Sequence, residues 1–138
     1  MTDKKYIRVV GAVILNSDDE ILCAQRPEGK NLALKWEFPG GKVEEDETET
    51  EALVRELDEE MECRIDVLDK ITTTVYEYDF GIVELTTYYA KILSGDIKLL
   101  EHVDMKWMSR ENIGVLDWAP ADIPAIELIQ NYKGAINK

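Results

Sequence analysis

Three glutamates, Glu56, Glu59 and Glu60, occupy positions i, i+3 and i+4 of a segment whose apolar residues recur at helical spacing. On a helix these carboxylates share one face within a single turn. Like charges at this spacing destabilise a helix by roughly 0.2–0.5 kcal/mol per pair. A hard divalent cation held by carboxylate oxygens would relieve the repulsion. The spacing therefore indicates either a metal site or a solvated acidic face.

The same segment carries the signals of an amphipathic helix. Thr48 followed by Glu51 forms a capping box, which predicts that the helix starts at Thr48. Leu53, Leu57 and Met61 recur every four residues and predict a buried stripe. Such a helix would hold the three carboxylates near its C-terminal end, where the helix dipole favours cations.

Neighbouring residues supply further groups. Arg55 lies four residues after Glu51 and four before Glu59, so it is expected to relieve part of the repulsion. Gly40 and Gly41 follow a short strand-like segment and predict a turn. Because glycine has no Cβ, the carbonyl of Gly40 is expected to approach a metal ion closely.

The order of residues from Gly41 onward resembles the Nudix box of the Nudix hydrolases. Gly41 is followed after five residues by Glu47, and after seven more by residues 55–57, which read Arg-Glu-Leu. One residue later comes the glutamate pair 59–60. The chain departs from the pattern at Glu62, where the family has glycine. If the helix ends as the family's does, Glu62 is expected to have a positive φ.

The resemblance implies magnesium chemistry. Mg²⁺ bridges a few carboxylates to substrate phosphates, and Mn²⁺ is expected to substitute for it. Paired ions activate a water and neutralise charge on the leaving group of a phosphoryl displacement. The implied metal ligands are Glu56, Glu59, Glu60, Glu101 and the carbonyl of Gly40. Glu56 is also implied to orient or deprotonate the water, while Glu47 and Arg55 support the loop through a salt bridge.

Later stretches resemble a subgroup of the family, the MutT-like nucleoside triphosphate pyrophosphohydrolases and the CTP pyrophosphohydrolases. Residues 101–109 resemble the segment that supplies a further acid, here Glu101; an ordinary loop glutamate is the alternative. His102, the only histidine of the chain, is expected to be a bystander.

Two stretches, LKWEFPGGKVE and APADIP, extend this resemblance to the substrate. Arg26 matches an arginine at the phosphate end of the subgroup's site, and Phe38 is implied to contact the substrate. Asp122 matches the position that faces the nucleobase, but it also suits the N-cap of the last helix. An ionised carboxylate only accepts hydrogen bonds, which favours cytosine or guanine over uracil and thymine. Trp118 either stacks on a base or fills the core.

Composition restricts the class of partner. The net charge is −13, and eleven of the 29 acidic residues lie between Glu44 and Glu62. A surface this acidic repels nucleic acid and anionic lipid, so neither is expected to bind. No apolar run approaches the roughly 18–20 residues of a membrane span, and no signal peptide precedes the first strand-like segment. Cys23 and Cys63 fall within apolar patterns and indicate buried, reduced thiols of a cytoplasmic protein.

The order of elements predicts one α+β domain spanning residues 1–138, as a monomer or homodimer. The expected strands are 6–15, 20–25, 36–39, 64–68, 70–78, 82–93 and 105–108, and the last helix is expected at 122–132. Ser109 is expected to cap a short helical turn, and Gly134 to end the last helix. The resemblance sharpens this to the Nudix fold, a mixed β-sheet sandwiched between α-helices.

The leading interpretation is Mg²⁺-dependent hydrolysis of nucleoside or deoxynucleoside triphosphates, oxidised or modified ones included, to a monophosphate and pyrophosphate. Dinucleoside polyphosphates are an alternative that Tyr76 and Tyr78 leave open. ADP-ribose is another, although its subgroup has a proline after the box and none lies between Pro39 and Pro120. Two further alternatives are not enzymes: a nucleotide-sensing module without catalysis, and an acidic interaction domain.

Overall fold

Seven strands form one sheet in the computed structural model, which describes residues 4–132. The strands are β1 (Tyr6–Leu15), β2 (Glu20–Gln25), β3 (Trp36–Glu37), β4 (Gly40–Lys42), β5 (Arg64–Tyr78), β6 (Gly81–Ser94) and β7 (Asp104–Ser109). The helices are α1 (Glu49–Met61) and α2 (Ile123–Asn131), with 3₁₀ turns η1 (Ile113–Val115) and η2 (Pro120–Asp122) between β7 and α2.

The sheet is mixed, as predicted. β1 pairs in parallel with β6 along its whole length, from Tyr6 opposite Ile82 to Leu15 opposite Lys91. β5 and β6 form a long antiparallel hairpin. β4 pairs antiparallel with β1, and β2 pairs antiparallel with both β3 and β7. The main path through the sheet is β3-β2-β1-β6-β5.

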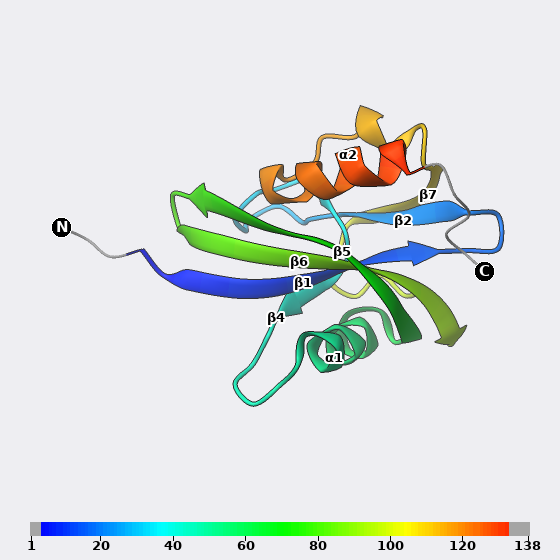
Figure 1. Cartoon of the computed structure of the whole chain (residues 1–138), viewed down its shortest axis with the longest axis horizontal. Helices are drawn as coiled ribbons and strands as arrows, with labels where there is room; N and C mark the ends of the chain where they lie inside the picture. Colours follow the sequence, from blue (N-terminus) through cyan, green and yellow to red (C-terminus); the bar gives the residue numbers. More distant parts are fainter. Residues whose placement is uncertain (1–3, 133–138) are drawn as a thin grey trace.

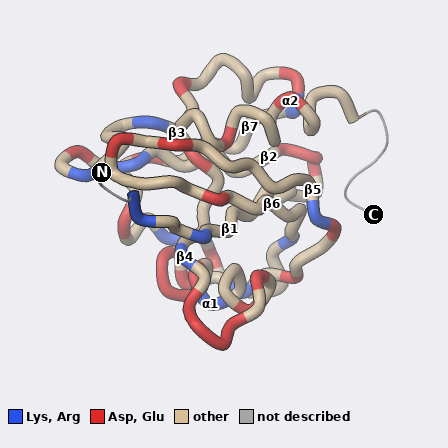
Figure 2. Tube along the Cα trace, turned by 60° about the vertical axis from the view of Figure 1, so that its left-hand side comes forward, with Lys and Arg blue, Asp and Glu red and all other residues tan. Residues whose placement is uncertain are grey.

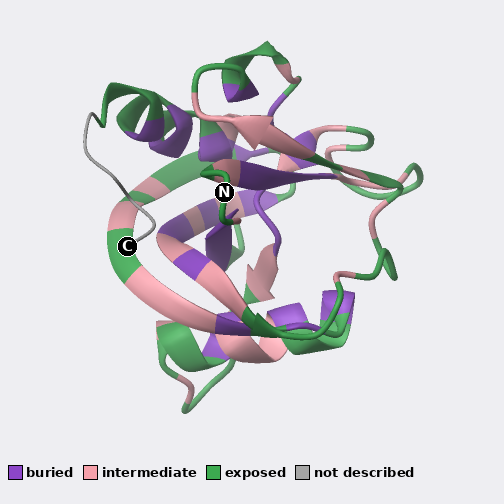
Figure 3. Ribbon diagram, turned by 90° about the vertical axis from the view of Figure 1, so that its right-hand side faces the viewer, coloured by how far each residue is buried: buried purple, intermediate pink, exposed green. Residues whose placement is uncertain are grey.

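The two α-helices cover opposite faces of this sheet (Figure 1). Successive side chains of a strand point to opposite faces, so β1 contributes to two cores. Ile14 packs in the cluster that contains Leu53 and Leu57 of α1, whereas Val13 packs in the cluster that contains Ile126 of α2. Buried residues gather along the sheet and on the sides of both helices that face it (Figure 3). The predicted α+β sandwich is confirmed.

Both ends of α1 follow the sequence signals. The Thr48 hydroxyl accepts a hydrogen bond from the Glu51 N–H at 3.1 Å, and the Glu51 carboxylate accepts one from the Thr48 N–H at 2.9 Å. This reciprocal pair is the predicted capping box. At the other end Glu62 has φ 51° and ψ 38°, in the left-handed region. The positive φ expected at this position is confirmed, with a glutamate in place of glycine.

The glycine pair lies in a strand and not in the predicted turn. β4 begins at Gly40, which lies opposite Gly11 of β1. A Cβ added to Gly40 would come within 1.9 Å of the carbonyl oxygen of Val10. The close approach of these two backbones therefore requires glycine at position 40.

Other boundaries also differ from the predictions. β5 is a single strand where two were expected, because bulges at residues 67–72 shift its register without ending it. Ser109 is the last residue of β7, and the helical turn that follows begins only at Ile113, so Ser109 does not cap it. α2 ends at Asn131, and Gly134 lies outside the described residues.

The surface and the buried thiols agree with the composition. Acidic residues cluster on α1 and on the loop before it (Figure 2). Cys23 and Cys63 are both buried and free, as predicted. Between residues 4 and 132, no helix is long and apolar enough to cross a membrane.

Candidate active site

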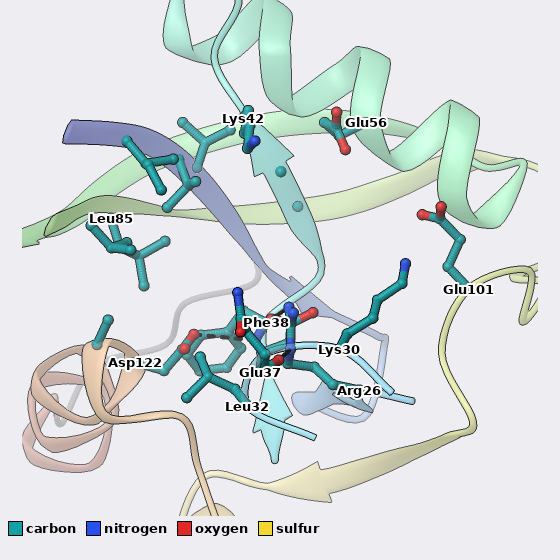
Figure 4. Close-up of a pocket in the computed structure, with 18 of the residues that line it drawn as sticks. Arg26, Lys30, Leu32, Glu37, Phe38, Lys42, Glu56, Leu85, Glu101 and Asp122 are labelled. Atoms are coloured by element: carbon teal, nitrogen blue, oxygen red, sulfur yellow. Dashed lines mark hydrogen bonds and ion pairs between the residues drawn. The ribbon is translucent and has the colours of Figure 1, made fainter. Parts of the chain in front are cut away.

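A cleft of about 520 Å³ lies between α1, β4, and the loops that follow β2 and precede β7. Glu56 and Glu101 lie toward one end of it and Asp122 toward the other, with Phe38 and Arg26 between them (Figure 4). The predicted site residues that line it are Arg26, Phe38, Gly40, Glu56, Glu60, Glu101 and Asp122. The others, Glu47, Arg55, Glu59 and Trp118, fall outside its lining.

Glu56 projects from α1 onto β4. A Cβ added to Gly41 would lie 2.0 Å from Oε2 of Glu56, so the carboxylate occupies the space that any other side chain at position 41 would fill. Another Glu56 oxygen, Oε1, accepts a hydrogen bond from Nη1 of Arg55 at 2.8 Å. Because Gly41 has no side chain, the Glu56 carboxylate can lie directly against the backbone of β4.

Glu60 is the most deeply buried of the three α1 glutamates, with 9% of its surface exposed. Its Oε2 has no hydrogen-bond partner among the described residues. Burial first, then the hydrogen bond and charge of Glu56, and then the charges of Glu101 and Glu37 raise the pKa of Glu60. Several carboxylates therefore face one small volume, where a cation would stabilise their ionised forms.

The predicted metal ligands are only partly assembled. Among residues 4–132, no three acidic, histidine or cysteine side chains are arranged as a metal cluster. Glu59 points away from the cleft: 56% of its side chain is exposed, and it pairs with Arg55 at 3.2 Å. The unpartnered oxygen of Glu60 and the neighbouring carboxylates nevertheless form an oxygen donor set that fits a hard divalent cation such as Mg²⁺.

Arg55 organises the charges beside the cleft. Its Nε lies 2.7 Å from Glu47 Oε2, and its Nη2 donates to the carbonyl oxygen of Lys42 at 2.9 Å. The hydrogen bond from Arg55 lowers the pKa of Glu47 to about 2. The predicted Glu47–Arg55 salt bridge is present. The expected contact with Glu51 is absent from the described interactions of Arg55, because the Glu51 carboxylate caps α1.

Asp122 is buried at the far end of the cleft. Its Oδ1 accepts a hydrogen bond from the Phe38 N–H at 3.3 Å. Burial, followed by repulsion from Glu37, raises the pKa of Asp122 well above its ordinary range. Asp122 is the N-cap residue of α2, as the alternative predicted, but its backbone angles are already helical and its side chain makes no capping hydrogen bond.

Trp118 belongs to the core. Only 5% of its surface is exposed, and its Nε1 donates to the carbonyl oxygen of Ile113 at 2.6 Å. Its ring centroid lies 4.8 Å from that of Phe38, which itself lines the cleft. The core alternative for Trp118 therefore holds and the expectation of a base contact is corrected, because its ring packs against Phe38 from the core side.

Several lining residues were not predicted as site residues, and His102, expected to be a bystander, is among them. Glu37 and His102 contact each other at 2.9 Å, and Lys30 lies on the loop after β2. The apolar wall beside Asp122 comes from β1, β5, β6, the turn between β5 and β6, and the loop after β2. It consists of Ile7, Val9, Leu32, Tyr78, Phe80, Val83 and Leu85. The only available signal was strand alternation, which marks a face as apolar without showing that it borders a cleft.

Comparison with known proteins agrees with this geometry. Residues 5–129 match the NUDIX domain family. The chain is 38% identical to the CTP pyrophosphohydrolase of Escherichia coli K12, over 95% of this chain and 96% of that protein. It is 30% identical to the 8-oxo-dGTP diphosphatase of the same organism, over 88% and 95%.

A solved structure supports the fold. It is a solution structure of a protein described as the DNA mismatch repair protein MutT, of the Nudix hydrolase family, from methicillin-resistant Staphylococcus aureus 252. The two sequences are 55% identical, with 92% of this chain and 97% of that one covered and a TM-score of 0.75. With the box on α1 and β4 and these matches along nearly the whole chain, the protein belongs to the Nudix family of pyrophosphohydrolases.

Proposed function

We propose that this protein hydrolyses nucleoside triphosphates to a nucleoside monophosphate and pyrophosphate with a divalent cation, Mg²⁺ or Mn²⁺. The observation that carries the proposal is the layout of the cleft. Glu56, Glu60 and Glu101 supply carboxylate oxygens at one end, and Asp122 lies in an apolar pocket at the other. A nucleotide has the matching layout, with a charged phosphate chain at one end and a flat, partly apolar base at the other.

The proposed metal ligands are Glu56, Glu59, Glu60, Glu101 and the carbonyl of Gly40, and Glu59 must turn from Arg55 toward the cleft to join the others. When bound, the cation neutralises phosphate charge and acidifies a water. The remaining work belongs to the chain. Arg26 and Lys30 offer cationic groups for the phosphates, Glu56 orients or deprotonates the attacking water, and the wall around Phe38 holds the base and excludes solvent.

Base choice is proposed to rest on Asp122. The Phe38 N–H bonds one carboxyl oxygen, and an amino or imino donor of the base would bond the other; both hydrogen bonds favour the ionised form of Asp122 against the effect of burial. Cytosine and guanine present such donors, whereas uracil and thymine present an acceptor at the matching edge. The names of the E. coli relatives, which mention CTP and 8-oxo-dGTP, support the same two bases.

Product release from a nucleotide panel tests the proposal, with pyrophosphate measured for the triphosphates and nucleoside monophosphate measured for every substrate. The panel contains the natural triphosphates, 8-oxo-dGTP, 5-methyl-dCTP, ADP-ribose and a dinucleoside tetraphosphate, each with and without Mg²⁺. We expect Mg²⁺-dependent turnover, with cytosine and guanine triphosphates above UTP and dTTP in kcat/KM. Asp122→Asn should flatten this preference while it changes kcat less. Nucleotide binding without hydrolysis would instead indicate a sensing module, and preferred turnover of ADP-ribose or the dinucleotide would reassign the substrate.

A further inference from the structure

His102 occupies a buried position between two parts of the cleft wall. β2 runs between β3 and β7, so the ends of these strands meet beside the cleft. Glu37 lies on β3 opposite Ala24, Arg26 directly follows β2, and His102 lies two residues before the start of β7. The Val103 N–H donates to the carbonyl oxygen of Gln25 at 3.0 Å, which fixes the loop carrying His102 against the end of β2.

The Glu37 carboxylate joins His102 to Arg26. Its Oε1 accepts from Nη1 of Arg26 at 3.0 Å, and its Oε2 lies 2.9 Å from Nε2 of His102. A carboxylate only accepts hydrogen bonds, so Nε2 of His102 is the donor. Arg26 is held at a second point, because its Nε donates to the carbonyl oxygen of Asn31 at 2.9 Å. The guanidinium is thereby fixed in one orientation at the cleft wall.

The imidazole is not placed there for packing alone. Its side chain is 5% exposed, and its Nδ1 is buried with no hydrogen-bond partner among the described residues. An unpartnered buried nitrogen costs free energy that an apolar side chain would avoid. The contact made by Nε2 is therefore the feature of His102 that requires a polar ring.

We propose that His102 is a positioning residue for the substrate phosphates, acting through Glu37 on Arg26. Without the imidazole, Oε2 of Glu37 loses its donor, and the carboxylate is free to rotate and draw the Arg26 guanidinium with it. The inference rests on the proposed function to the extent that Arg26 contacts phosphates. The Glu101–His102 loop then connects the acidic end of the cleft to its cationic wall.

Two matched variants separate the two ring nitrogens. His102→Gln places an amide donor near the position of Nε2 and removes Nδ1, whereas His102→Asn places an amide near Nδ1 and removes Nε2. We expect His102→Asn to raise KM for the preferred triphosphate roughly three- to tenfold with a smaller change in kcat, as loss of a ground-state contact predicts. His102→Gln should restore most of the loss, and His102→Asn should add little to Arg26→Ala in the double variant.

A readout independent of turnover follows the side-chain NMR signals of Arg26. In the wild type and in His102→Gln, slow rotation of the guanidinium is expected; in His102→Asn it should become fast. This result supports the positioning role even if no triphosphate is hydrolysed, in which case only the proposed function fails. Unchanged Arg26 signals in His102→Asn would overturn the inference. The inference would also be overturned if His102→Asn kept the wild-type KM and His102→Gln did not, because Nδ1 would then be the nitrogen that matters.

Discussion

The carboxylate of Glu56 rests on the bare Cα of Gly41, where an added Cβ would meet Oε2 at 2.0 Å. The neighbouring glycine is enclosed differently, because a Cβ on Gly40 would meet the carbonyl oxygen of Val10 at 1.9 Å. A carboxylate at the end of a flexible side chain can move aside, whereas strand backbone cannot move without breaking its pairing.

We therefore expect opposite outcomes from two alanine substitutions. Gly41→Ala should keep the melting temperature within a few degrees of wild type and lose most activity, because Glu56 is displaced. Gly40→Ala should unfold at a clearly lower temperature, because β4 is pushed off β1. Thermal unfolding and pyrophosphate release on both variants check this. Full activity in Gly41→Ala would show that catalysis does not require the Glu56 carboxylate to lie against Gly41.

Glu60 makes the protein less stable as its carboxyl ionises. The raised pKa means that the unfolded chain ionises above about pH 4.5 while the folded state resists, so stability falls as the pH rises from there. Glu60→Gln should therefore raise the melting temperature at neutral pH without metal, and should abolish both the stabilisation by Mg²⁺ and most turnover.

Glu59→Gln is the matched control, since its exposed carboxylate pairs with Arg55. Glu59→Gln should lose turnover without the rise in melting temperature. If either variant keeps turnover within a few-fold of wild type at saturating Mg²⁺, the substituted glutamate is not a metal ligand.

The Glu47–Arg55 pair predicts the opposite pH dependence. The pKa of Glu47 is lowered to about 2, so its stabilising contribution is complete above the ordinary value of 4.5 and is lost as the pH falls toward 2. The difference in unfolding free energy between wild type and Glu47→Gln should be largest above pH 4.5 and vanish near pH 2. Denaturant titrations at several pH values measure it. A difference that does not change between pH 6 and 2 would contradict the assignment.

Glu62 holds a conformation that suits glycine. At φ 51° a side chain costs of order 1 kcal/mol, and the salt bridge of Glu62 to Lys98 at 3.6 Å is exposed and weak. Glu62→Gly should therefore be neutral or stabilising, despite the greater entropy of glycine in the unfolded chain. Glu62→Ala is the control, because it removes the charge and keeps the Cβ. A lower melting temperature for Glu62→Gly than for Glu62→Ala would be the contrary result.

The parts of the site that could be predicted from sequence are local. The capping box at Thr48 follows from residue spacing, whereas the αL end at Glu62 and the Glu47–Arg55 pair were implied by the family resemblance. All three lie within one helix and its preceding loop. The contacts of Glu37 with His102 could not be predicted, because they depend on β3 and β7 flanking the same strand. Spacing along the chain carries no information about such pairings.

Asp122 is a second residue whose structural role could not be predicted from sequence. A helix-capping residue and a buried acceptor for the Phe38 N–H look alike in sequence, since both place an aspartate before an apolar helical run. Asp122 stands at the N-cap of α2, but the turn η2 starts the helical geometry before it, and its carboxylate bonds Phe38 instead of the helix. Whether such a turn forms depends on the packing of the segment against Tyr78, whose hydroxyl accepts from the Ala121 N–H at 2.8 Å.

The parallel pairing of β1 with β6 also restricts how the chain can be made. More than half of the chain lies between Tyr6 and its partner Ile82, and parallel pairing of distant segments is slow because a large loop must close first. During synthesis, the apolar residues of β1 leave the ribosome long before β6 exists to cover them. The β1 segment is thus exposed to aggregation on the nascent chain until β6 is made, well before any site can form.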